Sequence, residues 1–119
     1  MTQAIDIRRC SPEDLRRRLE AGDPVVVLDV REEEERRFCS IPLPGSATDL
    51  HVPIGHVPDL IDELRRVISG RSLFVYCHHG VRSLATARWL AEQGLADVAN
   101  LEGGIDAWSS SVDPGVPRY

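Results

Sequence analysis

Short apolar runs alternate with amphipathic stretches along most of this chain. Three runs, at residues 25–28, 72–76 and 98–101, consist mainly of apolar residues and show no regular alternation with polar ones. Such continuous runs are typical of strands that are covered on both faces. Two shorter strands are predicted at residues 5–7 and around residues 46–49, which gives five strands in all.

The stretches between these runs carry the start and stop signals of helices. Ser11 can cap a helix that begins at Pro12, and Gly22 can end it. Further helices are predicted before Gly70 and between Ser83 and Gly94, and residues 103–108 are expected to form a closing turn or helix. The inward-facing positions of the two middle helices are Leu60, Ile61, Leu64, Val67 and Ile68, then Leu84, Ala87, Leu90 and Ala91.

Strands that alternate with helices predict an α/β fold with a central, mostly parallel five-stranded sheet flanked by helices on both faces. We expect one domain over residues 1–119, with a core at about 4–108 and a serine- and proline-rich tail at 109–119 that lies on the surface. In parallel sheets, ligands gather at the carboxyl ends of strands. Asp29 and Arg31 follow one predicted strand, and Cys77 follows another.

A charge run at residues 32–37 is interpreted as a short solvated helix. Two acid–base pairs, Glu32–Arg36 and Glu33–Arg37, have the spacing and orientation that favour ion pairs along an exposed helix face. No functional role is assigned to these charges.

Composition excludes several classes of protein. The 119 residues suffice for one hydrophobic core, and the net charge of -5 argues against nucleic acid as a partner. No apolar run approaches the roughly 18 residues of a membrane span, and the N-terminus lacks the layout of a signal peptide. A cytoplasmic protein without a membrane partner is therefore expected. All fourteen basic residues are arginine, which we interpret as a codon preference.

The three cysteines, Cys10, Cys39 and Cys77, are widely separated. This odd count fits neither a disulfide framework nor a clustered zinc site. For Cys10 and Cys39 a packed structural role is the simplest interpretation.

Cys77 stands between a buried strand and a helix start, in the order strand, cysteine, glycine, arginine, serine, helix. Amides of such a turn and of the following helix start can point toward one centre. Thiolates at helix N-termini have pKa values of about 3.5–7.5, against about 8.5 for a free thiol. Gly80 permits the turn, and Arg82 adds positive potential. The loop at residues 77–83 is thus predicted to stabilise a nucleophilic thiolate and to attract an anion.

Two alternatives remain open for this loop. Cys77 could be a buried structural cysteine, although the order of residues around it favours a nucleophile. His78 and His79 could be exposed turn residues, anion contacts when protonated, or metal ligands with Cys77. A third ligand at suitable spacing is missing from the sequence, which argues against zinc.

The loop sequence Cys-His-His-Gly-Val-Arg-Ser at residues 77–83 resembles the active-site loop of rhodaneses. Residues 27–32 are similar to the first signature of that family, residues 101–108 to its closing signature, and residues 112–119 to the tails of stand-alone bacterial members and of some adenylyltransferases. The resemblance implies a sulfurtransferase of the thiosulfate type, without metal or organic cofactor, in which Cys77 carries sulfur as a persulfide. The substrate-binding loop would consist of His78, His79, Gly80, Val81, Arg82 and Ser83.

The same resemblance implies a small anionic sulfur donor and a thiol acceptor, or a sulfur-carrier or desulfurase protein as partner. Asp29 and Arg31 would be supports beneath the loop. Where the family commonly has Gly-His-Ile-Pro-Gly-Ala, this chain has Cys-Ser-Ile-Pro-Leu-Pro-Gly-Ser at residues 39–46, which leaves the rim of the pocket and the role of Cys39, including that of a resolving thiol, undetermined.

Three rival functions are weighed against a free sulfurtransferase. A phosphatase would need five residues between cysteine and arginine to enclose a phosphate, whereas this loop has four. A non-catalytic binding module would be expected to lack the cysteine. A relay subunit would use the same persulfide chemistry with a protein as donor.

Overall fold

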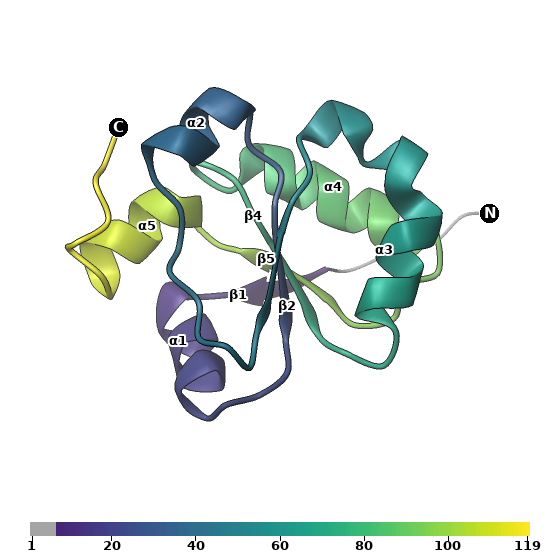
Figure 1. Ribbon diagram of the computed structural model, residues 1–119, viewed down its shortest axis with the longest axis horizontal. Coiled ribbons are helices and arrows are strands. Elements are labelled where there is room, and N and C mark those ends of the chain that lie inside the picture. Colours follow the sequence, from purple (N-terminus) through teal and green to yellow (C-terminus); the bar gives the residue numbers. More distant parts are fainter. Residues whose placement is uncertain (1–6) are drawn as a thin grey trace.

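Five parallel strands form one sheet at the centre of the molecule (Figure 1). The computed structural model describes residues 7–119, and within that range the strand order is β1-β5-β4-β2-β3. All four strand pairs are parallel, so the predicted "mostly parallel" sheet is parallel throughout. The strands are β1 (Arg8–Cys10), β2 (Val26–Asp29), β3 (Thr48–His51), β4 (Leu73–Tyr76) and β5 (Val98–Leu101).

Helices cover both faces of this sheet, as the sequence predicted. Residues that alternate along each central strand face opposite cores, because successive side chains of a strand point to opposite sides. Val27 and Phe74 pack with α1 and α5, whereas Leu28 and Val75 pack with α3 and α4. The helices are α1 (Pro12–Glu20), α2 (Glu33–Phe38), α3 (Ile61–Ile68), α4 (Val81–Glu92) and α5 (Gly104–Ser111), with 3-10 turns at Ile54–His56 and Pro58–Leu60.

Local signals account for most element boundaries. The Ser11 side chain accepts a hydrogen bond from the Asp14 amide at 3.1 Å, and α1 begins at Pro12, as predicted. The predicted strand at residues 5–7 falls mostly outside the described residues, and β1 begins at Arg8. The predicted strand around residues 46–49 lies two residues later, as β3.

No described helix has both the length and the apolar character that a bilayer crossing requires.

The segment at residues 109–119, predicted as a surface tail, is largely exposed, but two of its residues are buried. Helix α5 continues to Ser111, and Val116 is 4% exposed within the core that α1 and α5 share. The Ser109 hydroxyl donates a hydrogen bond to the Val116 carbonyl at 2.5 Å. Burial of one apolar side chain and one hydroxyl therefore fixes this segment, although its composition is typical of a loop.

The charge run in α2 also differs from its prediction. Only the Glu33–Arg37 pair forms as expected, with 3.6 Å between the charged atoms. Arg36 instead turns toward the sheet and bonds Asp49 at 2.7 Å and Asp29 at 3.3 Å. One face of this helix is thus solvated, and the other binds the carboxyl end of β2 through Asp29 and the first half of β3 through Asp49.

Candidate active site around Cys77

Cys77 lies at the carboxyl end of β4, the strand at the middle of the sheet. Its sulfur accepts hydrogen bonds from the main-chain amides of Gly80, at 3.1 Å, and Ser83, at 3.4 Å. Gly80 has a φ of 97°, a left-handed conformation that favours glycine, and it immediately precedes α4. The loop therefore folds its amides around the sulfur, and we call this arrangement the cradle.

The back of the cradle is held by the start of α5. The Ile105 amide donates to the Cys77 carbonyl at 2.9 Å, and the Asp106 amide donates to the His78 carbonyl at 3.1 Å. Gly104 makes this approach possible, because a methyl group on its Cα would overlap both carbonyl oxygens. Because the Cys77 and His78 carbonyls point outward and are hydrogen-bonded by α5, the amides of the loop can point inward at the sulfur.

Asn100 of β5 braces the same loop from the neighbouring strand. Its side-chain amide donates to the Gly80 carbonyl at 3.2 Å, and its side-chain oxygen accepts from the Ser83 hydroxyl at 2.5 Å. Both Asn100 and Ser83 are buried. The sequence reasoning missed Asn100, although a single amide within an otherwise apolar strand was the available signal.

Arg82 is paired with Glu35 of α2. Its two guanidinium nitrogens donate to the two carboxylate oxygens at 2.7 and 2.9 Å. The Arg82 guanidinium, together with the weaker Tyr119 hydrogen bond, lowers the pKa of Glu35 to about 2. The positive potential that the sequence analysis assigned to Arg82 is therefore offset by an acid from a different helix, α2.

Tyr119 completes the surroundings of the loop. Its ring stacks on the His78 ring with 3.8 Å between centroids and 7° between planes, and its edge contact with Phe38 spans 5.6 Å. Its hydroxyl donates to Glu35 at 2.6 Å and accepts from Arg31 at 3.0 Å. Burial, followed by the hydrogen bond to Glu35, raises the pKa of Tyr119 to about 12.

Four side chains thus form a continuous chain of contacts that begins and ends on the loop. We call His78, Tyr119, Glu35 and Arg82 the rim. Cys77 is 1% exposed, so an external compound reaches its sulfur only after part of its surroundings moves. Glu35 was placed in a solvated charge run by the sequence reasoning, and Tyr119 in a surface tail, so both rim residues were missed.

Asp29 and Arg31 are both fully buried and paired at 2.8 Å. The Arg31 guanidinium also donates to the Cys39 carbonyl at 2.7 Å and to the Tyr119 hydroxyl. The side-chain hydrogen bonds of this pair go to α2, the segment after it and Tyr119. The Arg31 guanidinium also lies over the ring of Tyr76, the residue directly before Cys77. The pair therefore anchors the rim and contacts the base of the loop through Tyr76.

The remaining cysteines are packed side chains. Cys39 is 9% exposed, and its sulfur contacts Arg31 at 3.9 Å and the Pro117 carbonyl at 3.6 Å. Burial raises the pKa of Cys10, which lies in β1.

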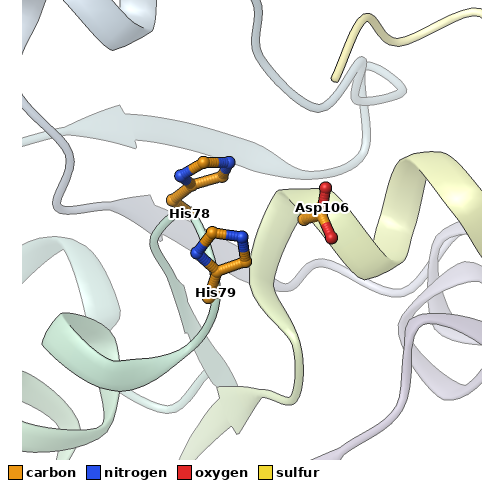
Figure 2. A group of neighbouring side chains, drawn as sticks. All are labelled: His78, His79 and Asp106. Atoms are coloured by element: carbon orange, nitrogen blue, oxygen red, sulfur yellow. The ribbon is translucent and has the colours of Figure 1, made fainter. Parts of the chain in front are cut away.

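His78, His79 and Asp106 offer ligand atoms within 4.8 Å of one another (Figure 2). Asp106 is the third potential ligand that the sequence did not reveal. Its carboxylate, however, accepts two hydrogen bonds from Arg118, at 2.9 and 3.1 Å. The two imidazole rings are tilted, with 3.8 Å between centroids and 31° between planes. A metal ion at these three residues would have to displace Arg118 from Asp106.

His78 lies between two aromatic rings, His79 on one face and Tyr119 on the other. Burial, and then the neighbouring His79, lowers the pKa of His78. Its Nε2 atom is buried and has no hydrogen-bond partner among the described residues. His79 and Val81 are exposed, and their side chains take no part in the cradle.

A thiol held by two main-chain amides at the end of a central parallel strand defines a class of α/β domain built around one cysteine. Comparison with known proteins agrees with this class. The model of the rhodanese-like domain matches residues 11–111. A sulfurtransferase of Allochromatium vinosum is 30% identical over 103 residues, which cover 87% of this chain and 89% of that protein.

Two further proteins show the range of this similarity. The adenylyltransferase and sulfurtransferase MOCS3-2 of Zea mays is 33% identical over 98 residues, which are 82% of this chain and only 20% of the maize protein. The crystal structure of a rhodanese-related protein from Thermoplasma volcanium, 30% identical, superimposes with a TM-score of 0.75 over 94% of this chain and 99% of that one. The chain belongs to the rhodanese-like domain family.

Proposed function

We propose that this protein is a sulfurtransferase that carries a sulfane sulfur on Cys77 as a persulfide. The observation that supports this most directly is the pair of amides on the Cys77 sulfur, from Gly80 at 3.1 Å and Ser83 at 3.4 Å. Amides that donate to a sulfur stabilise negative charge on it, and they do so without the reorganisation that water requires. The same donors suit a thiolate before attack and a terminal persulfide sulfur afterwards.

The reaction has two displacement steps. With thiosulfate as donor, the Cys77 thiolate attacks the outer sulfur, the S–S bond of thiosulfate breaks, and sulfite leaves with the electron pair. A thiophilic acceptor such as cyanide then attacks the outer sulfur of the persulfide. The Cys77–sulfur bond breaks, thiocyanate leaves, and the thiolate returns to the cradle. No electrons are gained or lost overall.

Replacement of the nucleophile tests this proposal. Cys77→Ser should lower transfer by on the order of 10³-fold or more, because the hydroxyl is a far weaker nucleophile at neutral pH. The matched control is Cys39→Ser, a second buried cysteine, which should retain activity. Intact-mass measurement after treatment with thiosulfate should find one added sulfur atom in the wild type and in the control, and none in Cys77→Ser. Activity retained by Cys77→Ser would refute the proposal.

A protein-borne persulfide is the donor class that the pairing of Arg82 favours over free thiosulfate. A small dianion needs a free cation at the loop, but both guanidinium nitrogens of Arg82 that face Glu35 are already bonded. A cysteine persulfide carries less charge than thiosulfate, so its binding depends less on a free cation. Transfer from a persulfidated cysteine peptide should therefore exceed thiosulfate turnover by about ten-fold or more in kcat/KM. Equal values for both donors would contradict this preference.

A further inference from the structure

Tyr119 and Glu35 join the two ends of the Cys77 loop. Tyr119 stacks on His78, the residue directly after the cysteine, while Glu35 binds Arg82 near the start of α4. The hydrogen bond from Tyr119 to Glu35, at 2.6 Å, links these two contacts into one continuous chain. The rim therefore connects the two ends of the loop, and the cysteine of that loop is 1% exposed.

The members of this rim are not equally well held. Glu35 and Arg82 form a two-point ion pair, with side chains 19% and 35% exposed. Tyr119 is 42% exposed and is held by one stacked ring, one edge contact and two hydrogen bonds of its hydroxyl. Of the four rim residues Tyr119 is the most exposed, so its displacement disturbs the least buried surface.

The closed position of Tyr119 also leaves a polar atom unsatisfied. The Nε2 atom of His78 is buried without a partner among the described residues while its ring lies between Tyr119 and His79. Leaving such a group unpaired costs free energy, and access of water would recover part of it. Outward movement of the Tyr119 ring would uncover one face of the His78 ring and give water an approach to this nitrogen.

We propose that Tyr119 is a specificity-determining residue that closes the approach to the Cys77 sulfur and selects sulfur compounds by their width. This inference rests on the sulfur-transfer role proposed above. With the ring in place, slim compounds reach the sulfur more readily than bulky ones. A compound or protein that displaces the ring from His78 gains full access.

Alkylation of Cys77 tests this selection without requiring any transfer activity. The rate constant for modification of Cys77 by N-ethylmaleimide would be measured by peptide mass mapping in the wild type, Tyr119→Phe and Tyr119→Ala. Cys77 should react about ten-fold faster or more in Tyr119→Ala, because the ring is gone. In Tyr119→Phe it should react about two- to four-fold faster, because the ring stays but the hydrogen bonds of its hydroxyl are lost.

Two controls separate access from general loosening. Arg118→Ala removes the neighbouring side chain, which bonds Asp106 outside the rim, and should change the Cys77 rate by less than about two-fold. Cys10 is 6% exposed and lies in β1, so its modification rate reports unfolding in the same samples. A rise at Cys10 that equals the rise at Cys77, or an unchanged Cys77 rate in Tyr119→Ala, would overturn the proposal.

Donor width provides the second measurement. The ratio of kcat/KM for benzenethiosulfonate to that for thiosulfate should rise by about five-fold or more in Tyr119→Ala and stay near the wild-type ratio in Arg118→Ala. An equal loss with both donors would assign Tyr119 a structural role only. If no variant transfers sulfur while the alkylation rates still differ as expected, the sulfurtransferase assignment fails and the control of access by Tyr119 stands.

Discussion

The cradle and the rim surround the same sulfur but are built in opposite ways. The cradle consists of main-chain amides whose positions are set by a strand, a glycine turn and a helix start. The rim consists of charged and aromatic side chains from α2, the loop and residue 119. Main-chain dipoles stay fixed while the fold is intact, whereas side chains exchange partners. In our proposal the cradle performs the chemistry, and the rim controls which compounds reach it.

The largest effect is expected where the rim is anchored in the protein interior. Arg31→Ala leaves the buried Asp29 carboxylate without its main partner and should lower the free energy of unfolding by about 3–5 kcal/mol. Urea denaturation measures this loss. Arg37→Ala, which breaks the exposed Glu33–Arg37 pair of helix α2, is the matched control and should be as stable as the wild type. If Arg31→Ala is as stable as the wild type, the rim does not depend on the buried Asp29–Arg31 pair.

A substitution behind the cradle should lower the rate of sulfur transfer more than it weakens the contacts of the rim. In Gly104→Ala the new methyl group would push against the Cys77 and His78 carbonyls and displace the amides from the sulfur. The rate of sulfur transfer should fall by about 100-fold, because a shift of about 1 Å in the groups around a reacting atom can slow a reaction by that factor. Gly45→Ala, where a methyl group meets nothing within 4 Å, serves as control. Normal transfer rates in Gly104→Ala would mean that amide placement does not limit the reaction.

A smaller, pH-dependent effect is expected from the ion pair of the rim. Because the pKa of Glu35 is lowered from 4.5 to about 2 in the folded protein, its contribution to stability is complete above pH 4.5 and is lost as the pH falls toward 2. Glu35→Gln should therefore lower the free energy of unfolding by about 1–2 kcal/mol at pH 7, a value reduced by the partial exposure of Arg82.

The pH dependence distinguishes this pair from an ordinary packing contact. The stability difference between the wild type and Glu35→Gln should shrink steadily between pH 4.5 and 2, when both are measured by thermal unfolding at each pH. A difference that stays constant over this range would show that the charge of Glu35 does not stabilise the rim.

Sequence patterns predict the parts of this molecule that depend on neighbours along the chain. The three central strands, the Ser11 cap and the loop around Cys77 follow from runs of apolar residues and from single residues such as Pro12 and Gly80. Of the two edge strands, β3 begins two residues later than predicted, and the strand predicted at residues 5–7 falls mostly outside the described residues. Even the cradle required only that a strand, a turn and a helix follow one another within a few residues.

The rim depends on contacts between residues far apart in the sequence, and for this reason it was not predicted. Glu35 and Arg82 are 47 positions apart, and Arg31 and Tyr119 are 88 apart. Glu35 stands in a run of acids with the spacing of a solvated helix, so its pattern is the same as that of its exposed neighbours. Only the packing of α2 over the carboxyl ends of the strands distinguishes it. The likeness to a known family likewise concerned the loop and its signatures, and gave no indication of which acid binds Arg82.

The contact between α5 and the back of the loop has a practical consequence for protein engineering. The amides of Ile105 and Asp106 hold the outer side of the loop, and Gly104 leaves room for them. A seven-residue loop transplanted onto another scaffold would therefore lose its shape, since its outer carbonyls would seek other partners. The smallest portable unit joins residues 77–83 to Asn100 and to residues 103–106, and a design that aims to place a reactive sulfur on a new protein has to carry all three.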